Sequence, residues 1–217
     1  GRVRTHVLDK RLMDVSIAPV ALPKSAVIDD DASHLNYPIF DKTIDVFKPI
    51  HWHLDLSTGR EFPKSFAHKT DIRSDKYGSA KHVWEVNRMQ FMLHIAMLYK
   101  QSGDEKYLDL FCFHLTDWKN ENPYMVGVNW YSNIEVNLRL ICWFFCWQVL
   151  DVDSLCKKNL VFEKFVRDVW MSMIFEHAEY SFNHPSLYSS ANNHLISEYA
   201  GLFVAACGGK IPHREKR

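Results

Sequence analysis

From about residue 80 onward, apolar side chains recur with the 3.6-residue period of an α-helix, and this pattern constrains the fold more than any other feature. Gly103, Asp104 and Asn122-Pro123 are residues that end or cap helices, and they divide the pattern into separate segments. Helices joined by short loops are typical of antiparallel helix hairpins. We therefore expect an all-α body with helices over about 80–101, 104–120, 132–150, 158–180 and, from Ser189 or Ser190, to about 207.

The first 75 residues lack this period and contain five of the eight prolines in the chain. Short apolar segments alternate there with turn residues such as Ser57-Thr58-Gly59. We predict that residues 1–75 form an irregular arm, with one or two short helices, that packs on a helical body formed by residues 76–217. The chain begins without Met and ends in a basic tract, so we expect it to be a fragment of a longer protein.

The charge balance excludes several classes of partner. Lys and Arg together number 26, as do Asp and Glu, so the net charge is zero and the basic excess of a nucleic-acid-binding protein is missing. The longest apolar run, Leu138–Leu150, contains Arg139 and Gln148 and is shorter than the roughly 20 residues that span a membrane. We therefore expect neither nucleic-acid binding nor membrane insertion.

The five cysteines do not form a Cys-x-x-Cys pair, and we interpret them as free, buried thiols. The chain contains no glycine-rich phosphate loop, no Gly-x-Ser-x-Gly elbow and no His-Glu-x-x-His motif. The twelve histidines are scattered without the spacing of metal ligands. The sequence thus predicts neither a metal site nor a cofactor.

Polar and aromatic residues concentrate near the starts of three of the five predicted helices. Tryptophan faces stack on sugar rings, and amide and guanidinium groups bind hydroxyls and carboxylates, so this set suits a sugar-binding groove. The other two helices carry no comparable set, and their polar residues are interpreted as solvated outer faces. Alternate helices would then form an inner row around a shared groove. The candidate residues are Trp84, Asn87, Arg88, Asn129, Trp130, Glu135, Arg139, Tyr188, Asn192, Asn193 and His194.

Each of these features also has a structural interpretation. Glu135 and Arg139 have the spacing of a helical ion pair, and Ser132 with Glu135 has that of a capping box. Tryptophans such as Trp84 and Trp130 are core residues in most proteins. The segment 192–194 could be a helix cap with a surface histidine.

Taken as an ordered set, the motifs resemble a known family. Over about residues 45–207, the chain is similar to the N-terminal helical domain of the heparinase II/III-like polysaccharide lyases, a group that includes alginate lyase relatives. The matching segments are His51-Trp52-His53-Leu54-Asp55, Asp71-Ile72-Arg73, Trp84-Glu85-Val86-Asn87-Arg88, Ser102–Tyr107, Asn122-Pro123-Tyr124, Gly127-Val128-Asn129-Trp130 through Glu135 and Arg139, and Tyr188–Leu195.

The resemblance implies an incomplete (α/α) toroid, followed in the family by β-sandwich domains that this chain does not contain. It also implies β-elimination at a uronic acid, in which the C5 proton is removed and the oxygen at C4 leaves. Asn193 matches the amide that neutralises the substrate carboxylate, and His194 matches a histidine of related lyases. The general base would be a tyrosine beyond residue 217, so the chain alone is expected to be nearly inactive.

By the same resemblance, the partner is an acidic polysaccharide of the heparan sulfate or alginate kind, the protein is a monomer, and its location is periplasmic or secreted. The sequence carries no signal peptide, so a cytoplasmic location stays open. Two other functions stay open as well. One is a non-catalytic carbohydrate-binding or polysaccharide-assembly protein on the same scaffold. The other is a toroidal glycoside hydrolase, which needs two carboxylates such as those of Glu85, Glu135 and Glu198.

Overall fold

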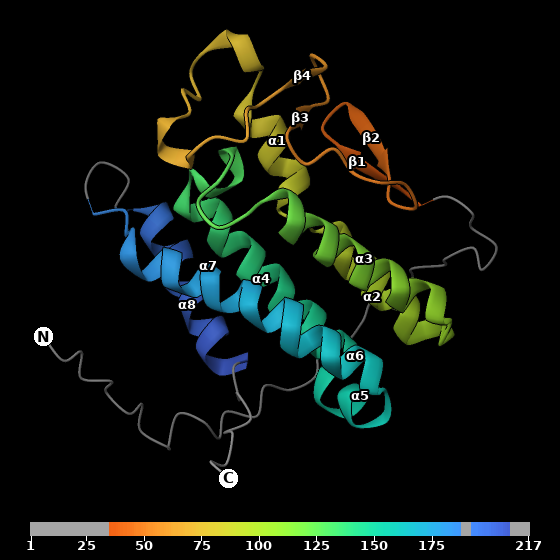
Figure 1. Ribbon diagram of the computed structural model, residues 1–217. Coiled ribbons are helices and arrows are strands. Elements are labelled where there is room, and N and C mark those ends of the chain that lie inside the picture. Colours follow the sequence, from red (N-terminus) through yellow and green to blue (C-terminus); the bar gives the residue numbers. More distant parts are fainter. Residues whose placement is uncertain (1–34, 188–191, 209–217) are drawn as a thin grey trace, which may run out of the picture.

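The computed structural model describes residues 35–187 and 192–208, and helices dominate this part of the chain (Figure 1). The predicted all-α class is confirmed. A π-helical turn, Val166–Trp170, connects the helix Leu160–Phe165 to the helix Met171–Asn183. The helices are α1 (Ala80–Asn87), α2 (Phe91–Ser102), α3 (Glu105–Glu121), α4 (Asn133–Leu150), α5 (Val152–Lys158), α6 (Leu160–Phe165), α7 (Met171–Asn183) and α8 (Asn193–Gly208), with 3₁₀ turns at Ala67–Lys69, Asp75–Tyr77 and Val128–Trp130.

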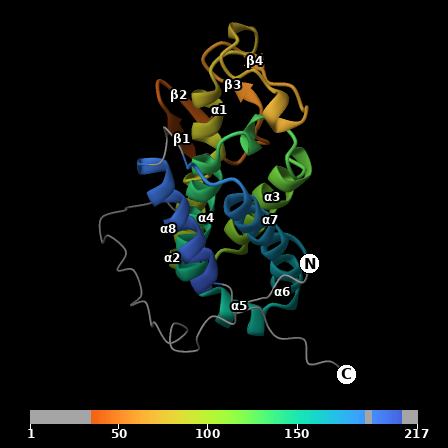
Figure 2. The ribbon, with the colours of Figure 1, turned by 90° about the vertical axis from the view of Figure 1, so that its left-hand side faces the viewer.

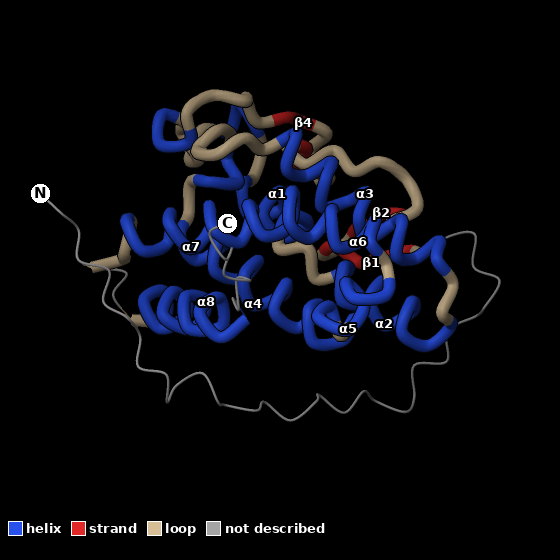
Figure 3. The backbone as a smooth tube through the Cα atoms, turned by 60° about the horizontal axis from the view of Figure 1, so that its bottom comes forward, coloured by secondary structure: helices blue, strands red, loops and turns tan. Residues whose placement is uncertain are grey.

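The long helices form two layers. Helix α4 lies between α2 and α8 in the first layer, while α3 and the continuous α6–α7 segment form the second (Figures 2 and 3). The predicted inner row of alternate helices is therefore present as α2, α4 and α8. Helix hairpins stacked in this way are consistent with a segment of an (α/α) toroid. Within the described ranges, no helix is both long and apolar enough to cross a membrane.

Aromatic side chains fill the space between the two layers. Trp118 on α3 meets Trp143 on α4 edge to face, with ring centroids 6.3 Å apart. Trp170, from the π-helical turn, packs on Phe111 at 5.1 Å and on Trp147 at the same distance. Rings of this size bury a large apolar area each, so the layers are held mainly by the hydrophobic effect.

One of the predicted helices is interrupted. The segment predicted as one helix over 80–101 breaks at Met89, whose φ of 58° ends α1 before α2 begins. The buried Met89 carbonyl accepts a hydrogen bond from the thiol of Cys142 on α4, so a tertiary contact accompanies the break. The helix predicted over 158–180 begins at Leu160, where the side chain of Asn159 caps α6, and continues through the π-helical turn to the end of α7, while the short α5 before it was not predicted.

The N-terminal arm contains strands that the sequence did not predict. Strands β1 (Asn36–Ile39) and β2 (Lys42–Asp45) form one antiparallel hairpin, and β3 (Leu54–Asp55) and β4 (Arg60–Glu61) form another. Segments of four and two residues are too short to show a period of two in the sequence. The arm covers the end of the helical body at which α1 lies (Figure 1).

A buried carboxylate, that of Asp55, holds this arm together. It is 0% exposed and accepts hydrogen bonds from the backbone N–H of Ser57 (2.9 Å) and of Ser79 (2.8 Å). The hydroxyls of Ser57 and Thr58 and the Nδ1 atom of His82 also lie within 3.0 Å of it. Burial alone would raise the pKa of Asp55, but these hydrogen bonds hold it well below the ordinary value.

Replacing Asp55 by asparagine is expected to lower the free energy of unfolding at neutral pH by at least about 2 kcal/mol, because several charge-assisted hydrogen bonds are lost. The native carboxyl has the lower pKa, so its contribution is complete above the unfolded value of about 3.9 and is lost as pH falls below it. Urea unfolding between about pH 3 and 7 measures the difference.

The exposed Asp71, which accepts one backbone hydrogen bond from Arg73, is the matched control. Asp71→Asn should change the free energy of unfolding by less than about 0.5 kcal/mol. Equal effects of Asp55→Asn and Asp71→Asn at neutral pH would contradict the structural role of Asp55.

Candidate functional site

An open groove of about 440 Å³ lies where the arm meets the ends of the helices. The predicted groove shared by the starts of the first, third and fifth helices is thereby confirmed, because residues of α1, α4 and α8 all border it. The arm and the end of α7 complete its walls. Its lining residues are His68, Ile72, Trp84, Tyr131, Ser132, Asn133, Tyr180, His184, Ser186 and His194.

A cluster of histidine and tyrosine rings forms one wall of this groove. The Nε2 atom of His68 lies 2.9 Å from the phenolic oxygen of Tyr180. The ring of His184 stacks on that of Tyr180, with centroids 4.3 Å apart and an angle of 20° between the planes. The ring of Tyr131 meets that of His68 edge to face at 6.2 Å. The cluster joins the arm, the segment before α4 and the end of α7.

Burial controls the charge of this wall. It lowers the pKa of His68, and the nearby His184 lowers it further, so the His68 imidazole is neutral at neutral pH. Burial also raises the pKa of Tyr180, against the opposing effect of Arg139. Tyr180 therefore keeps its proton at neutral pH and is a hydrogen-bonding group rather than a phenolate.

Trp84 and His194 are the two predicted site residues that line the groove. Trp84 is half-buried, and its indole N–H donates to the carbonyl of Val128 at 3.0 Å, which fixes the ring. His194 is half-buried in the first turn of α8. The groove therefore contains the indole of Trp84 and the imidazole of His194, as the sequence predicted.

Two of the four predicted asparagines, Asn192 and Asn193, lie at the start of α8 and are exposed. The carbonyl of Asn192 accepts the N–H of Ile196 at 3.3 Å, which is the position of an N-cap residue. Asn193 is the first residue of α8. Tyr188, the remaining residue predicted for this segment, lies outside the described residues.

Arg88 binds Glu135 across two helices in a bidentate ion pair, with N–O distances of 2.8 and 2.9 Å, and also contacts Glu85. The hydrogen bond to Glu135 raises the pKa of Arg88 despite partial burial. Because the Glu135 carboxylate is occupied in this way, the predicted capping box is not formed, and the Ser132 side chain makes no capping hydrogen bond. The guanidinium of Arg139 bonds other groups instead of Glu135.

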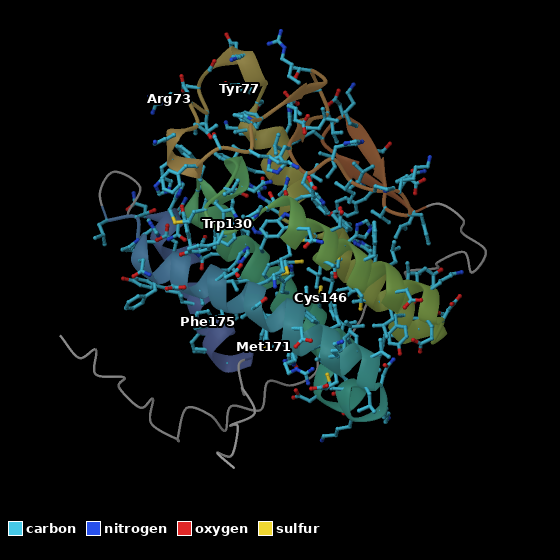
Figure 4. All side chains as sticks on the ribbon, viewed as in Figure 1. Arg73, Tyr77, Trp130, Cys146, Met171 and Phe175 are labelled. Carbon is cyan, nitrogen blue, oxygen red and sulfur yellow. The ribbon has the colours of Figure 1, made fainter. Side chains whose placement is uncertain are left out.

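Four other candidates are buried, which corrects the expectation that they contact the substrate directly. Asn87, Asn129, Trp130 and Arg139 are each 0% exposed. Figure 4 shows Trp130 at the end of the helical body that faces the arm. Their side chains are closed off from the surface of the groove, so we expect them to act on it by holding its walls in place.

The buried amides join the arm to the helices. The Asn87 amide donates to the carbonyls of Trp52 and Val83 at 2.7 Å each, and its oxygen accepts the indole N–H of Trp118. The amide of Asn129 donates to the same Trp52 carbonyl at 3.0 Å. Asn87 therefore points into the core, although the helical period placed it on one face with Trp84.

Arg139 is a buried cation without a hydrogen-bonded carboxylate among the described residues. Its Nε donates to Nε2 of His177 at 2.9 Å, and one terminal nitrogen donates to the carbonyl of Asn129 at 2.8 Å. The guanidinium carbon lies 4.9 Å from the ring centre of Trp118 and 5.9 Å from that of Trp130. Burial lowers the pKa of Arg139 to about 9, so the group stays protonated at neutral pH.

The sequence pattern did not predict a place in the groove for His68, Tyr180 or His184. The interpretation of the polar residues of the predicted helix 158–180 as a solvated face is wrong for the end of α7, where Tyr180 lines the groove. The spacing of four between Tyr180 and His184 was the available signal. His68 lies in the arm, where no periodic pattern indicates its direction.

The described residues contain no group of three or more His, Cys, Asp or Glu side chains arranged to hold a metal ion. The cysteines are free: Cys142 and Cys146 are buried, and Cys112, Cys156 and Cys207 are half-buried. Burial raises the pKa of the Cys112 thiol to about 12. A thiol of this kind is a poor nucleophile at neutral pH.

The two-layered helical fold defines an all-α domain with a groove lined by aromatic and imidazole rings at one end. The family model described as the heparinase II/III N-terminus matches residues 13–213. The chain therefore belongs to this family, and the resemblance seen in the motifs is confirmed. No curated protein and no solved structure shows significant similarity to the chain.

Proposed function

We propose that this domain binds a uronic-acid-containing polysaccharide in its groove and contributes to its cleavage by β-elimination. The observation that carries the proposal is the groove itself, where a fixed indole, two phenols and three imidazoles converge in a domain of the heparinase II/III family. A polymer of the heparan sulfate or alginate kind fits this set, because sugar faces stack on indoles and acidic sugars are bound by N–H donors.

The reaction removes the proton at C5 of the uronate and expels the oxygen at C4. The C5–H group becomes more acidic when a donor bonds or neutralises the adjacent carboxylate, because negative charge moves onto that carboxylate in the transition state. We assign this task to the side-chain amide of Asn193, at the start of α8, with His194 beside it in the groove. Elimination of this kind requires no redox or organic cofactor.

The proton acceptor is a separate group. Tyr180 is a weak candidate because burial raises its pKa and its oxygen is engaged with His68. In the family resemblance the base is a tyrosine from a later helix, and we retain that assignment.

Trp84 supplies the stacking face. The buried Asn87, Asn129, Trp130 and Arg139, together with the Arg88–Glu135 pair, are proposed as positioning residues. We further propose that Asn192 and Tyr188 contact the polymer and that the protein is a periplasmic or secreted monomer.

The test incubates full-length protein with heparan sulfate, alginate and an unsulfated glucuronate polymer, and follows the ultraviolet absorbance of unsaturated uronates. We expect absorbance to rise with at least one polymer and to stay flat with the same polymer after reduction of its carboxyl groups. Reduction removes the carboxylate whose neutralisation makes the C5 proton acidic. The carboxyl-reduced polymer is therefore the matched control.

Two outcomes would contradict the proposal. New reducing ends without unsaturated product would indicate a glycoside hydrolase. The structure does not favour this reaction, because two of its candidate carboxylates are engaged: that of Glu135 by Arg88, and that of Glu198 by the backbone and hydroxyl of Ser186. Binding of every uronate polymer without any product would indicate a carbohydrate-binding protein.

A further inference from the structure

Imidazoles dominate the ionisable groups that line the groove. His68, His184 and His194 contribute three of its ten lining residues, and the other ionisable residues of the lining are Tyr131 and Tyr180. No Asp or Glu side chain belongs to this lining. A surface of this composition is neutral or positive at every pH near neutrality, and it becomes more positive as the histidines take up protons.

His68 and His184 lie close together on this wall, although they come from the arm and from the end of α7. Their ring centroids are 5.5 Å apart, and the planes are nearly perpendicular at 80°. Both rings contact Tyr180, His68 through its Nε2 atom and His184 by stacking. Tyr180 thus holds the two imidazoles in a fixed mutual orientation.

Hydrogen bonds to the backbone fix His184 further. Its Nδ1 atom lies 2.9 Å from the carbonyl oxygen of Tyr180, so Nδ1 carries the proton and Nε2 is the second nitrogen of the ring. The side-chain amide of Asn133 donates to the carbonyl of His184 at 2.8 Å. The ring of His184 is therefore held by its stacking on Tyr180 and by the Nδ1 contact, while Asn133 holds the His184 backbone. Among the described residues, neither ring nitrogen has a hydrogen-bonded carboxylate.

We propose that His68, held against Tyr180 and His184, forms with His184 an anion-binding pair on the groove wall that takes an acidic substituent of the sugar chain, a carboxylate or a sulfate. Imidazolium N–H groups make charge-assisted hydrogen bonds to such oxygens. Protonated His68 donates through Nε2 to the Tyr180 oxygen and through Nδ1 to the ligand. This inference rests on the proposed function for the sugar, and it names residues other than Asn193 and His194.

The pair responds to pH because ligand binding and proton uptake are linked. Protonation of His68 adds a charged N–H donor to the groove wall, so an anionic ligand binds the protonated state of His68 more tightly than the neutral one. Burial and the neighbouring imidazole lower the pKa of His68 in the free protein. The affinity for an anionic sugar is therefore expected to increase as pH falls from about 8 to about 5.5, where uronate carboxylates are still ionised.

The charged groups around His68 and His184 do not reverse the expected increase in affinity as pH falls. From α8 come His194, which lines the groove, and Glu198, whose carboxylate accepts the N–H and the hydroxyl of Ser186. From the core, Arg139 acts on Tyr180 and opposes its raised pKa. Lys69 follows His68 in the arm and is exposed to solvent. The carboxylate of Glu198 acts on Tyr180 and raises its pKa, and a negative charge at this place favours positive charge on the wall, so it does not oppose the expected increase in affinity.

The experiment is calorimetric titration of full-length protein with an unsulfated hexasaccharide of alternating glucuronate and N-acetylglucosamine. We expect the affinity at about pH 5.5 to exceed that at about pH 8 by at least about tenfold, as a new charge-assisted hydrogen bond implies. The same hexasaccharide with its carboxyl groups reduced should show no such increase. A sulfated form binding more tightly than the unsulfated one at low pH identifies sulfate as the preferred anion, and the reverse identifies carboxylate.

The variant His68→Gln should remove most of the pH dependence, since glutamine donates a hydrogen bond without titrating. The variant His184→Gln removes the ring that packs beside His68 and should weaken binding of the hexasaccharide. His51 is exposed and outside the groove lining, so His51→Gln is the matched control and should keep the dependence of the wild type. Thermal unfolding of the variants establishes that each is folded. An affinity that is independent of pH, or a pH dependence that survives His68→Gln, would overturn the inference.

These outcomes separate the pair from the proposed function. Elimination activity with pH-independent binding refutes the anion-binding pair and leaves the lyase proposal intact. Binding that is pH-dependent and sensitive to His68→Gln, without unsaturated product from any polymer, supports the pair and refutes the lyase proposal.

Discussion

Replacing Asn193 by alanine in the full-length protein is expected to lower the rate of elimination by about 10²–10³-fold while leaving the melting temperature nearly unchanged. This expectation follows from the position of the Asn193 side chain. Asn193 is the first residue of α8, it is exposed, and it precedes His194, which lines the groove. An amide at this place stabilises developing charge on the substrate carboxylate without supporting the core. Steady-state turnover on the polymer that gives the strongest signal measures the effect.

Asn192 is the matched control, because it has the same side chain one position earlier. Its carbonyl accepts the N–H of Ile196, which makes it the N-cap residue. Asn192→Ala should therefore cost about 1 kcal/mol of stability and change turnover much less. If turnover is lost in Asn192→Ala and kept in Asn193→Ala, the assignment within the pair is wrong. If both variants lose only stability, the segment is a helix start and the site lies elsewhere.

The parts of the fold that the sequence predicted well are those with strong local signals. The observed α3 and α4 begin and end within about one residue of the predicted ranges, because Asp104 caps α3 and Asn122-Pro123 follows it. The alternation of polar helix starts also led to the correct inner row and to the groove. These features depend on residues that are neighbours in the chain, and local chemistry determines them.

The features that the sequence did not predict depend on contacts between distant segments. The break at Met89 has no glycine or proline to mark it, and its carbonyl is bonded by a cysteine 53 residues away. Asn87 was placed on the groove face because the helical period could not show that Trp52, Val83 and Trp118 satisfy its amide in the core. The sequence does not distinguish a polar helical residue that faces a groove from one whose hydrogen bonds are made in the core.

The candidate site divides in the same way. His194 and Trp84 reach the groove as predicted, because a helix start and a family motif fix their place. His68, in contrast, comes to Tyr180 from a segment 112 residues earlier, and only the folded arm brings the two rings together. Sites assembled from an irregular arm and a helix end carry little signal in one sequence, so this wall of the groove could be found only in the structure.

Arg139 gives the largest expected effect on stability. Replacing it by alanine is expected to lower the free energy of unfolding by about 3–5 kcal/mol, because the change opens a cavity between the helix layers and leaves buried acceptors without a donor. Those acceptors are Nε2 of His177 and the carbonyl of Asn129. Burial is the main cause that holds the pKa of His177 far below its ordinary value, and it persists in the variant, so the imidazole does not become a cation that could replace the guanidinium. Urea unfolding at neutral pH measures the loss.

Two further variants separate charge from packing. Arg167→Ala removes an exposed arginine paired with Glu163 and Asp168, and should destabilise the fold far less than Arg139→Ala, because exposed ion pairs contribute little. Arg139→Met fills most of the volume without a buried charge, whose desolvation the aromatic rings of Trp118 and Trp130 offset only in part. Its cost should therefore be smaller than that of Arg139→Ala. A methionine variant as unstable as the alanine variant would mean that the hydrogen bonds to His177 and Asn129, rather than the filled volume, stabilise this part of the core.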